Sequence, residues 1–327
     1  MRIAIDAMGG DHAPEEMIKG ALEAVGYPGV EIVLVGKEAL LRPRIDGLRR
    51  RTSSLSIIDA QEVVTTHESP LQAVKSKPDS SIAVGMSLVK GGEVSAFVSA
   101  GNTGAVAATA HLSLGLADGV ERMALGLVYH AVSGPTLLLD VGANADCRPS
   151  FLVQFAHMGS AYIERMWGIP RPRVALLSIG EEESKGNRLV QQSHQLLKAT
   201  KLNFVGNVEG NSLNRGLADV IVTDGFTGNV VLKAIEGFGE AMAQSFSRNL
   251  SAKPHLKIAS FFLRGSMRAL ARRMDYSETG GAFLLGVKGN VIVAHGRSQA
   301  KAIASAISLA RQMVEQGMPQ NLLEAKL

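Results

Sequence analysis

The stretch Asp219–Glu236, with the sequence DVIVTDGFTGNVVLKAIE, combines a strand, a turn and a helix. It opens with the β-branched run 220–222, which predicts a buried strand. Apolar residues recur at helical spacing from Val230 onward, which predicts a helix. Between them lies Asp224–Asn229, where two glycines allow the backbone to approach a ligand closely. We expect Thr227 to cap the helix, whose first N–H groups could then bind an anion.

This turn has two interpretations that the sequence leaves open. Lys233 lies one turn into the predicted helix and could reach back to the turn. A strand, a glycine-rich turn and a helix with a lysine then form an arrangement suited to phosphate. The same pattern also occurs as an ordinary strand-to-helix connection of an α/β protein.

The composition indicates a globular protein with a large core, since 46% of the 327 residues are hydrophobic and 20% are charged. Predicted strands and helices alternate along most of the chain, which indicates an α/β fold with a mainly parallel sheet covered by helices. We predict one unit over residues 1–327, with two lobes and a cleft between them. No apolar run approaches about 20 residues, which predicts a cytoplasmic protein without a membrane-spanning segment.

Several predicted strands, including the one at 220–222, end in glycine combined with Asn, Asp or Thr, and ligands of such sheets bind beyond the carboxyl ends of the strands. These turns are Gly101–Gly104, Gly142–Asp146, Lys185–Asn187 and Gly225–Asn229. The spacings of the dinucleotide fingerprint and of the P-loop are both missing. The single cysteine, Cys147, excludes an internal disulfide, and the eight histidines lack the spacing of metal ligands. We therefore predict no metal and expect the turns to bind and orient a substrate.

Residues 250–275 predict a basic amphipathic helix. The chain has no acidic residue from Ala241 to Met274, and arginines recur there every four residues. A helix with a cationic face and an apolar face can lie on an anionic membrane surface, although it can also pack into a core, a dimer or an acidic partner. The residues predicted to contact a membrane or a carrier protein are Lys257, Phe261, Phe262, Leu263, Arg264, Arg268 and Arg272.

Seven short blocks together resemble one family along nearly the whole chain. The blocks, in order, are DAMGGD at 6–11, SAGNTG at 99–104, DVGAN at 140–144, KGN at 185–187, TDGFTGN at 223–229, GGA at 280–282 and HG at 295–296. In this ordered set the chain resembles the bacterial acyl-acyl-carrier-protein:phosphate acyltransferases, the PlsX family.

The resemblance implies an isopropylmalate-dehydrogenase-like fold, a homodimer and peripheral association with the membrane. It implies a reaction in which acyl-acyl carrier protein (acyl-ACP) and inorganic phosphate give acyl phosphate and free carrier protein, without a cofactor. The acyl phosphate would pass to a membrane glycerol-3-phosphate acyltransferase, on the route to phosphatidic acid and phospholipids.

This chemistry suggests roles for the polar residues of the turns. Phosphate is already anionic and a thiolate leaves readily, so the protein has to hold phosphate beside a thioester and stabilise the oxyanion. We predict that Lys185 contacts phosphate or the oxyanion, that Asn187 and Asn229 act as orienting donors, and that Asp224 positions a donor or moves a proton. The predicted substrate-binding residues are Asp6, Gly9, Gly10, Asp11, Gly101, Asn102, Thr103, Gly104, Asn144, Gly225, Phe226, Thr227, Gly228, Lys233 and His295.

Three alternatives compete with this prediction. A phosphotransacetylase acting on acyl-CoA shares the phosphate chemistry, but no nucleotide pocket can be found in the sequence. A dehydrogenase of similar fold would need NAD and a divalent metal, and no carboxylate cluster has metal spacing. A non-catalytic adaptor at the membrane surface would leave the glycine-rich turns unexplained. Nucleic-acid binding is weaker still, because the net charge is only +4 and no binding motif occurs.

Overall fold

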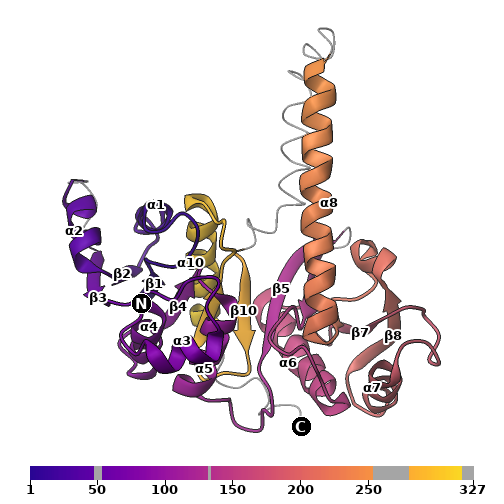
Figure 1. Ribbon diagram of the computed structural model, residues 1–327. Helices are drawn as coiled ribbons and strands as arrows, with labels where there is room; N and C mark the ends of the chain where they lie inside the picture. The colour runs from indigo at the N-terminus through magenta and orange to yellow at the C-terminus, as the bar shows by residue number, and fades with distance from the viewer. Residues whose placement is uncertain (48–53, 132–133, 253–279, 319–327) are drawn as a thin grey trace.

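The structure is a computed structural model that describes residues 1–47, 54–131, 134–252 and 280–318. Within this part, eleven strands form one sheet in the order β3-β2-β1-β4-β11-β10-β5-β6-β9-β7-β8 (Figure 1). Seven neighbouring pairs are parallel and three are antiparallel. The predicted α/β class with a mainly parallel sheet is therefore confirmed. The division into two lobes with a cleft, and the single unit over residues 1–327, stay predictions.

The first half of the sheet consists of parallel strands from both ends of the chain. Its strands are β1 (Arg2–Asp6), β2 (Glu31–Gly36), β3 (Leu55–Asp59), β4 (Ala96–Ser99) and β11 (Asn290–Val293). Its helices are α1 (Glu15–Ala24), α2 (Glu38–Asp46), α3 (Pro70–Ser76), α4 (Ser81–Lys90), α5 (Thr103–Leu114) and α10 (Ala300–Glu315).

The second half is also parallel, and two strands join it to the first half. Its strands are β6 (Gly134–Leu139), β7 (Arg173–Ser178), β8 (Asn203–Glu209) and β9 (Val220–Val222). Its helices are α6 (Pro149–Trp167), α7 (Arg188–Lys198), α8 (Gly225–Ala252) and the short 3₁₀ helix η1 (Gly210–Arg215). The joining strands are β5 (Ala124–Ala131) and β10 (Ala282–Leu285). The far part of α8 extends away from the sheet (Figure 1).

The chain direction reverses three times at the middle of the sheet. β10 is antiparallel to β11 and to β5, and β5 is antiparallel to β6. After three reversals the strands of the second half run opposite to those of the first. The carboxyl ends of β1, β4 and β11 therefore lie at one edge of the sheet, here the first edge. Those of β6, β7 and β9 lie at the opposite, second edge. The glycine-rich turn after β4 and those after β6, β7 and β9 therefore lie at opposite edges of the sheet.

Apolar side chains cover both faces of the sheet, as expected for strands buried between helices. In β1 and β2, alternate residues such as Ile3 and Leu34 belong to one buried cluster, and Ala4 and Val33 belong to another on the other face. α4 lies directly on the second cluster because Gly85 has no side chain: a Cβ there would lie 2.1 Å from Phe97 Cε2.

Most predicted elements occur close to their predicted bounds, and three were missed. The sequence predicts a helix over Pro149–Trp167, and α6 has the same ends. It also predicts a strand over Thr136–Val141, and β6 begins at Gly134 and ends at Leu139. α2 was missed because Pro43 and many charges hide its pattern. β5 and β10 were missed because their apolar runs, which contain or adjoin glycines, lack the alternation of apolar and polar residues that indicates a strand. Among the described residues, no helix is long and apolar enough to cross a membrane.

Candidate functional site

Asp140 organises the second edge of the sheet. The residue is fully buried, and its carboxylate accepts five hydrogen bonds of 2.8–3.0 Å. Four come from the backbone N–H groups of Leu125, Gly142, Ala143 and Asn144, and the fifth comes from Asn144 Nδ2. Burial raises the pKa of Asp140, and the hydrogen bonds oppose that rise. This carboxylate was not among the predicted site residues, although it directly follows an apolar strand and precedes Gly142 by two positions.

The start of α8 packs directly on the Asp140 turn. The Gly225 N–H donates to the Asn144 carbonyl at 2.8 Å, and Asn229 Nδ2 donates to the Val141 carbonyl at 3.1 Å. Gly228 touches the end of β6 so closely that a Cβ there would lie 1.9 Å from the Asp140 carbonyl oxygen. The predicted residues Asn144, Gly225, Gly228 and Asn229 therefore do come together.

Asp224, and not Thr227, caps α8. Its carboxylate accepts the Thr227 N–H and the Thr227 hydroxyl, both at 2.8 Å, and the helix begins at Gly225. The prediction that Thr227 is the cap is wrong because Asp224 lies at the correct distance before the first turn. The N–H groups of Gly225, Thr227 and Gly228 all donate hydrogen bonds within the chain. That they bind an anion stays a prediction.

The loop carrying Lys185 lies at the same edge, because β7 is the neighbour of β9. Asn187 caps α7 by accepting the Val190 N–H at 3.0 Å. Gly186 has φ +94°, a conformation that favours glycine. The Lys185 N–H donates to the Glu182 carbonyl at 3.0 Å, while its side chain is exposed. No carboxylate within the described part of the chain forms an ion pair with that ammonium. Lys185 therefore offers an accessible cation at the second edge.

A second group of predicted residues gathers at the first edge. A Cβ on Gly9 would lie 2.8 Å from the Gly101 nitrogen, and the Asp11 N–H donates to the Gly296 carbonyl at 2.8 Å. Asp6, which is buried, accepts the Ser99 hydroxyl at 2.7 Å and the Met8 N–H at 3.1 Å. Burial raises the pKa of Asp6. The predicted residues that meet here are Asp6, Gly9, Gly10, Asp11 and Gly101, with His295 beside Gly296.

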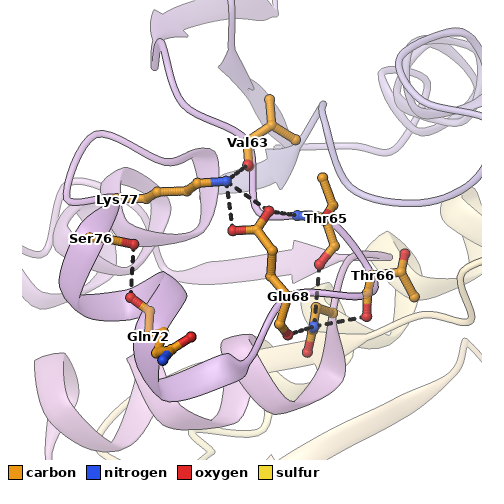
Figure 2. A network of polar contacts seen from close by, with 8 residues as sticks. Val63, Thr65, Thr66, Glu68, Gln72, Ser76 and Lys77 are labelled. Carbon is orange, nitrogen blue, oxygen red and sulfur yellow. Dashed lines mark hydrogen bonds and ion pairs between the residues drawn. The ribbon is translucent and has the colours of Figure 1, made fainter.

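Asn102 ties the turn after β4 to a neighbouring loop. It caps α5 by accepting the Ala105 N–H at 3.0 Å, and its Nδ2 lies 3.1–3.3 Å from the carbonyl oxygens of Thr65, Thr66 and Glu68. Gly104, one position after Thr103, lies against Pro70, the first residue of α3 after this loop. Figure 2 shows the other contacts of the loop: Glu68 bonds Lys77 at 2.7 Å, and Lys77 Nζ donates to the Val63 carbonyl.

The Glu68–Lys77 pair makes this loop sensitive to acid. Lys77 and the Thr65 N–H lower the pKa of Glu68 from 4.5 to about 2. A carboxyl with a lowered folded-state pKa stabilises the fold above its unfolded pKa, and this contribution fades as the pH falls through the folded value. We therefore expect Glu68→Gln to lower the urea midpoint at pH 6 and to lower it less at pH 3. An equal shift at both pH values would contradict the assignment.

α8 connects the two edges. Glu236 follows Gly225 by three helical turns, roughly 16 Å along the axis at 1.5 Å per residue. Its Oε2 lies 3.9 Å from His295 Nε2 and 3.8 Å from Lys233 Nζ. Lys233 thus points further along the helix, away from the turn at 224–229, and the expectation that it reaches back is not met. His295 and Lys233 come together near the first edge instead.

The candidate site therefore consists of two groups at opposite edges and a helix between them. Phe226 is two-thirds exposed at the second edge, and Thr103 is exposed at the first. Among the described residues, no group of His, Cys, Asp or Glu could hold a metal ion. The predicted contact residues Lys257, Phe261, Phe262, Leu263, Arg264, Arg268 and Arg272 lie outside the described residues.

Solved structures with a similar fold include two kinds of enzyme. A phosphotransacetylase from Streptococcus pyogenes has a TM-score of 0.63 at 19% identity, with 96% of this chain and 94% of that chain covered. A 4-hydroxythreonine-4-phosphate dehydrogenase from Klebsiella pneumoniae has a TM-score of 0.57 at 15% identity, with 95% and 99% covered. At these identities the likeness concerns the fold alone.

Sequence comparison gives a much closer relation. A family model described as fatty acid synthesis protein matches residues 1–321. A protein of Thermoanaerobacter pseudethanolicus is 47% identical over 325 residues, which cover 99% of this chain and 97% of that protein. One of Dehalococcoides mccartyi is 46% identical over 327 residues, covering 99% and 94%. Both are named phosphate acyltransferase. The chain thus belongs to the fatty acid synthesis protein family, and its resemblance to the phosphate acyltransferases is confirmed.

Proposed function

We propose that this chain transfers an acyl group from acyl-ACP to inorganic phosphate, and so supplies acyl phosphate for the synthesis of phosphatidic acid. A phosphate oxygen attacks the thioester carbonyl, the C–S bond breaks, and the carrier thiol leaves as a thiolate that takes up a proton. The family relation supports an acyltransferase. The observation that carries the proposal is the accessible Lys185 ammonium at the carboxyl end of β7, beside turns held in fixed geometry.

The contacts of the polar residues narrow their proposed roles. The Lys185 ammonium binds a phosphate oxygen or stabilises the developing oxyanion. The oxygen of Asn187 caps α7, which leaves its amide nitrogen for substrate. Asn229 Nδ2 donates to Val141, and since an amide nitrogen has two hydrogens, the second can meet substrate. Asp224 is bonded to Thr227 through both oxygens and therefore positions the turn.

Phosphate-dependent release of free thiol tests this proposal. Purified palmitoyl-ACP and palmitoyl-CoA are compared as donors, and hydroxylamine traps any acyl phosphate. Trapped product from the carrier-protein donor supports the proposal. Product from palmitoyl-CoA alone would favour the phosphotransacetylase-like alternative, which the similar fold of the Streptococcus pyogenes enzyme makes reasonable. If neither donor gives product, the remaining alternative is a non-catalytic adaptor at the membrane surface.

We also infer that the active protein is a homodimer joined through α8. Exposed apolar residues recur every four positions along this helix, at Phe226, Val230, Ala234 and Phe238. The exposed fraction is 66% for Phe226, 55% for Val230 and 62% for Phe238. Residues four apart lie on one side of a helix, so these form one apolar face. A contiguous exposed apolar face usually marks an interface, and the same face on a second copy is complementary to it.

Phe238→Glu is expected to turn the dimer into a monomer in light scattering, because burying an unpaired carboxylate costs several kcal/mol. Leu112→Glu is the matched control, since Leu112 is 60% exposed on a different helix, α5. A dimer that survives Phe238→Glu would place the interface elsewhere.

The proposed membrane role belongs to residues 250–275, most of which lie outside the described residues. Acyl phosphate is lipid-like, so its release at a bilayer would favour transfer to a membrane glycerol-3-phosphate acyltransferase. We expect serine in place of Phe261, Phe262 and Leu263 to abolish sedimentation with anionic vesicles. Sedimentation as strong as that of the unchanged chain would remove this part of the proposal.

A further inference from the structure

Asn207 on the edge strand β8 is buried beneath the Lys185 loop. β8 carries one extra residue relative to β7, because Val174 pairs with Phe204 whereas Leu176 pairs with Asn207. Gly206, within this bulge, has φ +98°. A bulge of this kind turns the side chains that follow it to the other face of the strand. Asn207 is thereby brought under the loop that joins β7 to α7.

A chain of hydrogen bonds runs from α7 through Asn207 to that loop. Asn207 Nδ2 donates to the Glu182 carbonyl at 3.0 Å, and His194 Nδ1 lies 2.9 Å from Asn207 Oδ1. The same Glu182 carbonyl accepts the Lys185 N–H. Asn207 therefore holds the carbonyl that fixes the backbone of Lys185.

The orientation of these groups follows from the donors. Because the Asn207 nitrogen faces a carbonyl, its oxygen faces His194 and has to accept, which assigns a hydrogen to His194 Nδ1. The imidazole is itself fixed: it is buried, and it meets the Phe204 ring edge-on at 5.0 Å. Both side chains are shielded from water. Hydrogen bonds between buried groups are strong, and their loss is costly.

Other contacts hold the same loop from its outer side. Gln191 Nε2 donates to the carbonyls of Ser184 at 2.7 Å and Gly186 at 3.2 Å. Glu183 pairs with Lys198 at 2.6 Å on the surface, where a pair contributes little. Asn207 is the buried contact of this set, and it bonds the same Glu182 carbonyl that accepts the Lys185 N–H.

We propose that Asn207, oriented by His194, is a positioning residue that sets where Lys185 stands in the reaction. The inference rests on the proposed function, since it acts through the lysine assigned to phosphate. A displacement of about 1 Å in such a group can cost up to 10²-fold in rate.

Asn207→Asp tests the proposal by replacing the donor to Glu182 with an acceptor, and Asn207→Ala removes the contact without adding charge. With palmitoyl-ACP as donor and phosphate varied, we expect kcat/KM for phosphate to fall about 10–100-fold in both variants. The KM for palmitoyl-ACP should stay unchanged, whereas a general loss of structure would change it as well. Asn203→Asp is the matched control: Asn203 also donates to a carbonyl, that of Arg171 at 3.0 Å, from the other end of β8.

Two further measurements separate positioning from folding. If Asn207 acts through Lys185, then Asn207→Asp combined with Lys185→Ala should lower kcat/KM by less than about 2-fold relative to Lys185→Ala alone. Hydrogen exchange at the amides of residues 183–187 should quicken about tenfold in Asn207→Asp and stay unchanged in Asn203→Asp.

The outcomes distinguish failure of this inference from failure of the proposed function. Three results would each overturn the positioning role of Asn207. They are unchanged hydrogen exchange at residues 183–187 in Asn207→Asp, an equal fall of kcat/KM in Asn203→Asp, and a full further fall of kcat/KM when Asn207→Asp is added to Lys185→Ala. Full activity of Lys185→Ala alone would overturn the assignment of Lys185, and with it any role of Asn207 in the reaction. In that case faster exchange in Asn207→Asp would still show Asn207 as a tether of the loop.

Discussion

Lys185→Ala is expected to lower the rate of phosphate-dependent acyl transfer about 10²–10³-fold, the usual effect of removing one group that stabilises a developing oxyanion. The ammonium is exposed, and its backbone is held from below by Asn207 through Glu182. Loss of the side chain should therefore remove the charge without moving the loop. Hydroxylamine trapping of acyl phosphate at saturating palmitoyl-ACP measures the effect, because it reports the product itself.

Two further variants serve as controls for Lys185→Ala. Lys201→Ala removes another exposed lysine of the same half and should leave the rate unchanged. Lys185→Arg keeps the charge but changes its shape, and we expect it to recover part of the rate. The thermal unfolding temperature should hardly move in any of the three, since surface substitutions usually have small effects. A rate near that of the unchanged chain in Lys185→Ala would remove this lysine from the mechanism.

The sequence was sufficient to predict the α/β class and the positions of the turns, because both are local features. Apolar runs followed by glycine-rich segments identified the ends of β4, β7 and β9. The sequence could not predict that these ends lie at opposite edges. That arrangement depends on β10 pairing antiparallel with β5, which lies more than a hundred residues earlier in the chain. No local pattern encodes such a pairing.

The roles of individual polar residues were harder to predict for a different reason. The residue types that bind substrate in turns also cap helices and tie loops, since both tasks need short side chains with amide or carboxylate groups. Asn102, Asn187 and Asp224 were predicted from this chemistry, and each caps a helix in the structure. Asp140 and Asn207 were missed because their importance comes from burial and from partners distant in sequence.

Gly228→Ala is expected to destabilise the fold by about 3 kcal/mol, at the upper end for overpacking of a well-packed site. The added Cβ would lie 1.9 Å from the Asp140 carbonyl oxygen and 2.9 Å from the Asp140 carbonyl carbon. Because both of these are backbone atoms, no flexible side chain can move aside to relieve the contact. Either α8 must shift or the end of β6 must. Urea unfolding at pH 7 measures the loss in free energy.

Gly239→Ala supplies the matched control because it makes the same change in the same helix, where a Cβ would meet nothing within 4 Å. Alanine is favoured over glycine inside helices by about 1 kcal/mol, so this variant should be neutral or stabilising. Equal effects of the two substitutions would contradict the close contact between α8 and β6. If they differ as expected, the contact at Gly228 also fixes Asn229, whose amide bonds the Val141 carbonyl one residue beyond Asp140. Acyl transfer by the folded fraction of Gly228→Ala should then fall as well, because the same shift that relieves the clash moves a proposed donor away from its substrate.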